Sequence, residues 1–146
     1  MVESLVALVV LSVGMLGIAG LYISSLKAGR SALVRTQAVA LATDLADRIR
    51  ANRGGLGSYV TASYGVDGPA INAACLGGDC KPDALAADDL GRWYSMIGLL
   101  MPQGTTGTVT FAANADPNLP DTYTITIAWR ESGETADSTC SMAVSL

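Results

Sequence analysis

An uncharged run near the N-terminus constrains the fold of this chain more than any other feature. The stretch from Leu5 to Leu26 contains no Asp, Glu, Lys or Arg and is rich in Leu, Val and Ile. As an α-helix it rises about 33 Å, which matches the hydrocarbon core of a bilayer, about 30 Å thick. We therefore expect one membrane-spanning helix, followed by enough chain for a single small domain.

The helical pattern continues beyond this run. Apolar residues recur at steps of three and four at Val34, Ala38, Leu41, Leu45 and Ile49. The pattern predicts a helix of some 50 residues, about 75 Å long, that runs to about Arg53. Gly54 and Gly55 are expected to end it through a left-handed C-cap. A cleaved signal peptide is the alternative, but the start Met1–Glu3 lacks the basic residues that such a peptide carries.

Composition excludes several classes of function. The chain has no His, so Ser-His-Asp triads and HExxH zinc sites are impossible. It also lacks a phosphate-binding loop and a dinucleotide fingerprint, so we expect neither enzymatic activity nor a cofactor. Residues 55–146 hold three basic and ten acidic side chains, a balance of −7, which disfavours nucleic acid as a partner.

Charged clusters in the chain fit ordinary structural roles. Asp44 precedes Arg48 by four residues and Asp47 precedes Arg50 by three. Ion pairs within the helix therefore explain these arginines better than a nucleic-acid surface does.

Two acidic segments were weighed as chemical sites. The adjacent Asp88 and Asp89 would point about 100° apart on a helix, so a solvated face is expected rather than a catalytic pair. The segment around Asp116, Asn118 and Asp121 could offer oxygens to calcium. It lacks the glycine and the distal glutamate of an EF-hand loop, so we expect an Asx/Pro turn and no metal.

The last two thirds of the chain predict an α+β domain. Pro82 opens a helical pattern that Pro102 closes, with Trp93 as a core anchor. The expected apolar face consists of Leu85, Leu90, Trp93, Ile97 and Leu100. Three strands are expected at 108–112, 123–130 and 139–146, as an antiparallel meander covered by the helix face around 34–49.

Three cysteines leave two pairings open. Cys75 and Cys80 bracket a Gly-rich loop and are close enough to form a disulfide, with Cys140 as a buried free thiol. The alternative is a pair that involves Cys140. Paired, exposed cysteines indicate an oxidising compartment.

Several segments resemble a known family. Glu3 followed by SLVALVVLSVGMLGIAGLYISSL resembles the N-terminal helix of type IV pilins and of type II secretion pseudopilins. The segments DLADRIRANR (44–53), DDLGRWYSMIGLLMPQGTTGTVTF (88–111) and YTITIAW (123–129) resemble the PilV branch of minor pilins.

The resemblance implies a pilin-like α+β fold, in which a long helix packs on a small antiparallel sheet. Its parts would be a transmembrane and assembly helix (1–26), an amphipathic continuation (27–53) and a periplasmic headgroup (54–146). Glu3 matches the family glutamate that meets the N-terminal amine of a neighbouring subunit. Gly14, Gly17 and Gly20 would serve helix packing or local melting, two roles between which the sequence does not choose.

The resemblance also implies a location and partners. The protein would sit in the bacterial inner membrane before it enters the pilus. Partners would be other minor pilins, the major pilin, a tip adhesin, the assembly platform and the prepilin peptidase. That peptidase would remove a short basic leader before a methylated Phe upstream of Met1. Lys27, Arg30 and Arg35 oppose a periplasmic C-terminal domain under the positive-inside rule, whereas the cysteine pair favours it.

Two alternatives stay open at this stage. A minor pseudopilin of a type II secretion system would have the same helix and a similar small domain. A membrane-tethered extracellular binding module would use the helix as a simple anchor, without a filament.

Overall fold

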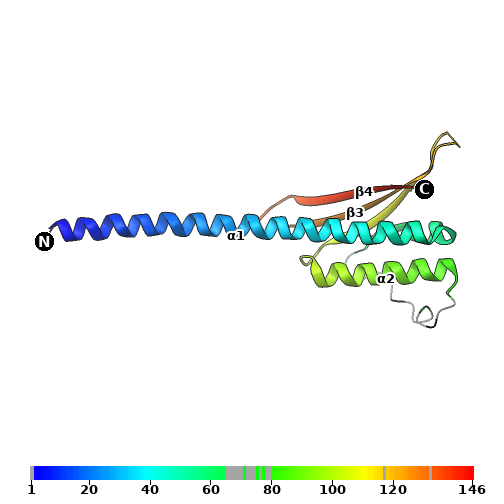
Figure 1. Ribbon diagram of the computed structural model, residues 1–146, viewed down its shortest axis with the longest axis horizontal. Helices are drawn as coiled ribbons and strands as arrows, with labels where there is room; N and C mark the ends of the chain where they lie inside the picture. The colour runs from blue at the N-terminus through cyan, green and yellow to red at the C-terminus, as the bar shows by residue number, and fades with distance from the viewer. Residues whose placement is uncertain are drawn as a thin grey trace. The chain divides into compact units, whose positions relative to one another are not determined.

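The computed structural model describes residues 2–64, 71, 75, 77, 80–116, 118–131 and 133–146. Its elements, in chain order, are α1 (Val2–Ala51), the 3₁₀ helix η1 (Arg53–Tyr59), β1 (Thr61–Tyr64), α2 (Pro82–Leu100), β2 (Thr106–Ala112), β3 (Thr122–Arg130) and β4 (Asp137–Ser145) (Figure 1). The chain divides into two compact units, residues 1–33 and residues 34–146. Each unit is described separately.

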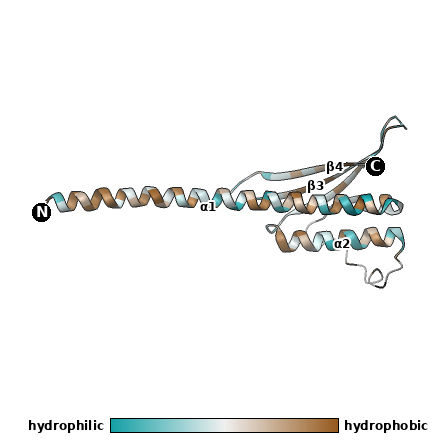
Figure 2. Ribbon diagram, viewed as in Figure 1, coloured by the Kyte–Doolittle hydropathy of each residue, from teal (hydrophilic) through white to brown (hydrophobic). Residues whose placement is uncertain are grey.

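The N-terminal unit is helical throughout its described residues. From Val2 to Arg30 every residue is exposed. Figure 2 shows that this part of α1 is predominantly hydrophobic. The uncharged run therefore forms the predicted helix, and its apolar side chains are exposed.

The end of α1 differs from the prediction. The helix stops at Ala51, and η1 follows over Arg53–Tyr59. Neither glycine supplies the left-handed cap that the sequence suggested, because Gly55 has φ −107° and the described residues with positive φ are Gly104 and Gly133. A Cβ on Gly55 would lie 2.4 Å from the carbonyl oxygen of Pro82, so close approach of α2 explains this glycine.

Two helical segments cover one side of the sheet in the C-terminal unit. The predicted face of α1 is buried, together with two further alanines: Val34, Ala38, Leu41, Ala42, Leu45, Ala46 and Ile49. Trp93 of α2 is 1% exposed, and its indole N–H donates to the carbonyl oxygen of Leu41 at 3.0 Å. The core anchor is thus confirmed, and α2 lies alongside the C-terminal part of α1 (Figure 1). Leu100, which was predicted to be on the apolar face, is 38% exposed.

The sheet is an antiparallel meander in the order β1-β2-β3-β4. The three predicted strands are present, each within two residues of its expected bounds. Side chains alternate along β3, where Tyr123, Ile125, Ile127 and Trp129 are all buried. These residues join the helix faces in one hydrophobic core. The α+β class and the pilin-like arrangement are therefore confirmed.

The fourth strand, β1, was not predicted. It pairs with β2 through Thr61–Val109 and Tyr64–Gly107, with a register irregularity between these two pairs. Its four residues, Thr-Ala-Ser-Tyr, carry no apolar alternation. Local pattern alone could not distinguish this segment from a loop.

Candidate functional site

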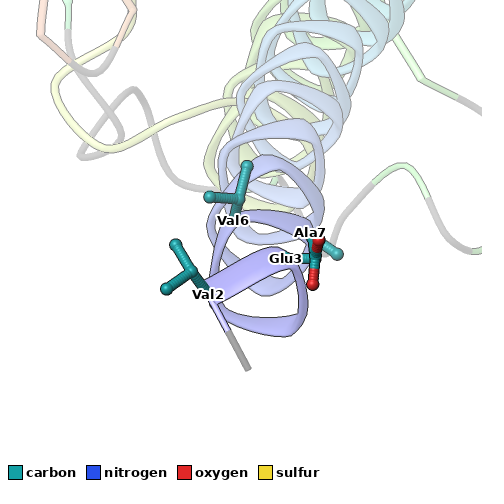
Figure 3. Close-up of a pocket in the computed structure, with 4 residues that line it drawn as sticks. All are labelled: Val2, Glu3, Val6 and Ala7. Atoms are coloured by element: carbon teal, nitrogen blue, oxygen red, sulfur yellow. The ribbon is translucent and has the colours of Figure 1, made fainter.

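Glu3 lies in the first turn of α1. It lines a shallow hollow together with Val2, Val6 and Ala7. Figure 3 shows Glu3 and Ala7 on one side of the helix and Val2 and Val6 on another. This side of the first turn therefore presents one carboxylate in an otherwise apolar surface.

The three candidate glycines lie farther along the same exposed part of α1. Apart from its own stretch of helix, a Cβ added at Gly14, Gly17 or Gly20 would meet no atom of the described residues within 4 Å. Packing within the chain therefore does not explain them. Small residues of this kind allow helices to approach closely in lipid.

Large apolar side chains surround these residues on α1. Leu5, Val9 and Leu16 are 64%, 62% and 73% exposed. By length and composition, α1 is able to cross a membrane, and its most apolar window is not buried in the chain. Water penalises such an exposed apolar surface, which is typical of helices that contact lipid or other apolar helices.

A partly buried polar network connects the end of α1 with η1 and α2. The Arg48 guanidinium donates to Asp44 at 2.9 Å and to Asp89 at 2.9 Å. The Tyr59 hydroxyl donates to the other carboxylate oxygen of Asp89. Asn52 donates to the Tyr59 oxygen at 3.3 Å and to the Pro82 carbonyl at 2.8 Å. The predicted Asp44–Arg48 pair is therefore present, but it belongs to a larger structure.

The prediction of a solvated Asp88–Asp89 face was wrong. Asp88 is 4% and Asp89 is 6% exposed. Asp88 accepts from Arg92 at 2.7 Å, and its other carboxylate oxygen has no hydrogen-bond partner among the described residues. The energetic cost of burying these two carboxylates is offset because each pairs with a guanidinium group. The spacing Asp88-x-x-x-Arg92 is the one sequence signal that indicated this outcome.

Burial and hydrogen bonding shift two pKa values in the network. Burial, and then the hydrogen bond to Asp89, raise the pKa of the Tyr59 phenol well above its usual value. For Arg48, burial acts to lower the pKa, but the bonds to Asp44 and Asp89 outweigh it, so the net shift is upward. Both shifts favour a neutral phenol and a charged guanidinium, the forms that support the network's hydrogen bonds. The donors and acceptors of the network pair with one another, an arrangement suited to holding α1, η1 and α2 together.

The cysteines pair as predicted. Cys75 and Cys80 form a disulfide, with their Cα atoms 5.0 Å apart. Cys140 is a free thiol on β4, and it is half-buried rather than fully buried. The Asp47–Arg50 pair is also present, at 2.8 Å.

The loop around Asp116 forms the expected Asx turns. The backbone N–H of Asn118 donates to the Asp116 carboxylate at 3.0 Å, and that of Asp116 donates to the side-chain oxygen of Asn114 at 3.1 Å. The bond from Asn118 lowers the pKa of Asp116. Among the described residues, no group of three or more acidic or Cys side chains is arranged to hold a metal ion.

An open hollow of about 610 Å³ lies between α1 and α2. Its apolar lining includes Met96, Leu99 and Leu100, and its polar lining includes Arg48 and Arg92. Both arginines already pair with carboxylates, so the hollow does not present an uncompensated charge of its own.

The comparisons with known proteins agree with this arrangement. Residues 20–91 match the family model described as Tt1218-like, type IV pilin Tt1218. Neither a search of curated proteins nor a search of solved structures found a significant match. The matched region begins within the apolar part of α1, includes the buried face of that helix and ends inside α2, so it contains the network residues Arg48, Tyr59 and Asp89. Over residues 20–91, which are 72 of its 146 residues, the chain is similar to the type IV pilin family.

Proposed function

We propose that this protein is a PilV-like minor pilin, which primes pilus assembly and contributes to the tip of a type IV pilus. The observation that carries the proposal is the exposed apolar surface of the uncharged run from Leu5 to Leu26, with a single carboxylate, Glu3, just before it. A pilin subunit leaves the membrane and joins a filament, so the same surface must suit both lipid and neighbouring helices.

Because of the apolar run, moving α1 from the lipid bilayer into a filament of similar helices changes the free energy little. Lipid chains are about as apolar as Leu and Val side chains, so the hydrophobic effect does not by itself drive helices together in a bilayer. Close packing and polar contacts must then determine the position of a subunit in the filament. Gly14, Gly17 and Gly20 would permit the close packing, or would let the helix melt locally as it enters the filament.

Glu3 would supply the polar contact. An unpaired carboxylate within a bundle of apolar helices is costly, so a subunit gains stability in the register at which Glu3 meets a positive group. The N-terminal amine of a neighbouring pilin is that group in our proposal. The contact fixes the axial position of the new subunit without a large specific interface.

The proposed location is the bacterial inner membrane, with the C-terminal unit in the periplasm until incorporation. The Cys75–Cys80 disulfide supports this orientation, because disulfides persist in oxidising compartments. Lys27, Arg30 and Arg35 favour the opposite orientation, and a basic leader would restore the bias. Protease treatment of spheroplasts tests this: the C-terminal unit should be digested while the membrane stays intact.

The central experiment replaces Glu3. We expect Glu3→Gln, which keeps the shape and removes the charge, to remain in the membrane but to reach sheared pili at about one tenth of the wild-type amount or less. Glu3→Asp is the matched control and should retain part of the incorporation. Quantitative mass spectrometry of the membrane and pilus fractions measures both. Wild-type incorporation of Glu3→Gln would refute the assigned role of Glu3.

Crosslinking in native membranes separates this proposal from its alternatives. Crosslinks to the major pilin, other minor pilins or the assembly platform support the pilus. Crosslinks to secretion-system pseudopilins would instead assign the protein to that machine. An N-terminus without prepilin peptidase processing, together with crosslinks to neither group, would favour a tethered binding module.

A further inference from the structure

Strand β4 forms an open edge of the sheet. The sheet order is β1-β2-β3-β4, so among the described residues β4 pairs only with β3. The pairing is continuous from Arg130–Asp137 to Thr122–Ser145, without a register shift. The opposite edge, β1, is only four residues long and irregular.

The direction of the unpaired backbone groups follows from one hydrogen bond. The N–H of Leu146 donates to the carbonyl oxygen of Asp121 at 3.0 Å, so the N–H of Leu146 points toward the β3 side. In an antiparallel ladder this direction alternates from residue to residue. The N–H and C=O groups of Thr139, Ser141 and Ala143 therefore point away from β3, toward the open edge.

The core beneath this edge is incompletely covered. On β3 all four inward side chains are buried, whereas on β4 only Val144 is. The inward side chains of Cys140 and Met142 are half-buried and pack against the core from its margin. One more strand beside β4 would cover both side chains and would satisfy the outward backbone groups.

Edge protection of the usual kinds is missing from β4. Edge strands normally avoid pairing with another chain because they are short or contain Lys, Pro or a bulge. β4 has nine residues, a continuous register and, from Ser138 to Ser145, neither a charged residue nor a proline. Asp137 at its start is its one charged residue.

We propose that β4 binds an extended segment of a different protein, added to the sheet as a fifth strand. Only an extended backbone complements alternating N–H and C=O groups at this spacing. The half-covered Cys140 and Met142 require apolar side chains at every second position of the bound segment. The uncharged edge favours a segment without charges over its central residues. This binding site is separate from Glu3. The choice of partner rests on the proposed membrane anchoring through α1, and it does not depend on the assembly role of Glu3.

A second copy of this chain fits the edge less well. Two β4 strands paired antiparallel would place their α1 helices in opposite directions, whereas chains anchored in one membrane through α1 share one direction. Copies with a common direction could pair β4 with β1, but β1 covers only four of the nine residues. The partner is therefore a different protein.

The test uses the full chain in detergent micelles and a synthetic probe. The probe is the capped peptide TYTITIAWR, the sequence of β3, whose alternation matches the two faces of β4. N-methyl groups at the positions of Ile125 and Ile127 block one edge of the probe strand. The other edge can still form hydrogen bonds to β4, but probe molecules cannot assemble into an extended sheet with one another. Its matched control has N-methyl groups at the positions of Thr124 and Thr126, which blocks the edge that would face β4.

Amide hydrogen exchange reports the binding. We expect the amides of Thr139, Ser141 and Ala143 to exchange rapidly in the free protein and at least about tenfold more slowly with the probe. The double variant Ser141→Pro/Ala143→Pro removes two outward donors and no bond to β3, so probe binding should weaken about tenfold or more. Ser141→Ala/Ala143→Ser should bind like the wild type, and unchanged tryptophan fluorescence verifies that each variant is folded.

Three outcomes would overturn the inference. The first is protection of these amides without the probe, which would mean that the edge is already covered. The second is equal binding of the proline variant, or of the control peptide. The third is concentration-dependent protection that the proline variant abolishes, because a second copy of this chain would then occupy the edge.

Discussion

Gly107→Ala should destabilise the C-terminal unit through a contact between β2 and α2. A Cβ at this position would lie 2.6 Å from Cη2 and 2.7 Å from Cζ3 of Trp93, and 3.0 Å from Cδ1 of Ile97. Carbon atoms normally pack about 3.5–4.0 Å apart. The overlap is therefore about 1 Å against a rigid ring.

Neither partner can move away freely. The Trp93 indole is held by its hydrogen bond to Leu41, and the backbone of Gly107 is held because its carbonyl accepts from the Tyr94 hydroxyl at 3.0 Å. Overpacking of a core costs about 1–3 kcal/mol, and we expect about 2–3 kcal/mol here because relief would break a buried hydrogen bond. That loss corresponds to a fall in Tm of about 10 °C for a unit of this size.

Urea unfolding of the full chain in detergent micelles, followed by tryptophan fluorescence, measures the effect. Both tryptophans, Trp93 and Trp129, are buried in the C-terminal unit, so the signal reports on that unit. Gly57→Ala is the matched control, because its Cβ would meet nothing within 4 Å, and it should change stability by less than about 0.5 kcal/mol. The Gly107→Ala cost should shrink by about 1 kcal/mol in a Trp93→Phe background, which lacks the clashing ring atoms. An equal cost in both backgrounds would refute the reasoning.

Two further predictions concern the network and the cysteines. Tyr59→Phe should lower the free energy of unfolding at pH 7 by about 1–2 kcal/mol, because Asp89 loses a buried donor. The pKa of Tyr59 is raised in the folded protein, so the neutral phenol stabilises the fold. This contribution is complete below about pH 10, the pKa of tyrosine in the unfolded chain, and is lost as the pH rises toward the pKa of Tyr59 in the folded protein. Above about pH 10, this group should therefore lower the free energy of unfolding by up to about 1.4 kcal/mol per pH unit. Urea unfolding at a series of pH values should show a smaller decrease per pH unit for Tyr59→Phe than for the wild type. Equal decreases would contradict the assignment of this pH dependence to Tyr59. Alkylation of the denatured, unreduced chain should label Cys140 alone, whereas reduction first should allow all three cysteines to react; labelling of Cys75 or Cys80 before reduction would be evidence against the disulfide.

Periodicity in the sequence predicted the parts of the fold that depend on one buried face. The steps from Val34 to Ile49 and the alternation from Tyr123 to Trp129 each report which side of an element avoids water. Those sides are buried in the structure. The pairing of Cys75 with Cys80 could be proposed because the two residues are close in sequence.

The features that were missed depend on contacts between elements. Asp88 and Asp89 looked like solvent-facing residues because Arg48, which binds Asp89, is 41 residues away in sequence. Gly55 was assigned a left-handed cap because its contact with Pro82 was invisible in the local pattern. The proposed role of Glu3 involves a second chain, so one sequence could suggest it only by resemblance.

In the proposed filament, the polar network would also determine how a pulling force passes through the C-terminal unit. Arg48 lies in the last turn of α1 and Asn52 follows that helix, while Asp89 and the Pro82 carbonyl belong to α2. Tension along the helix would load these hydrogen bonds together in shear. Hydrogen bonds resist displacement in a defined direction, whereas apolar contacts give way by sliding because their attraction has no preferred direction. The mechanical strength of the junction between helix and sheet domain would therefore depend on a few oriented bonds as well as on the area of the core.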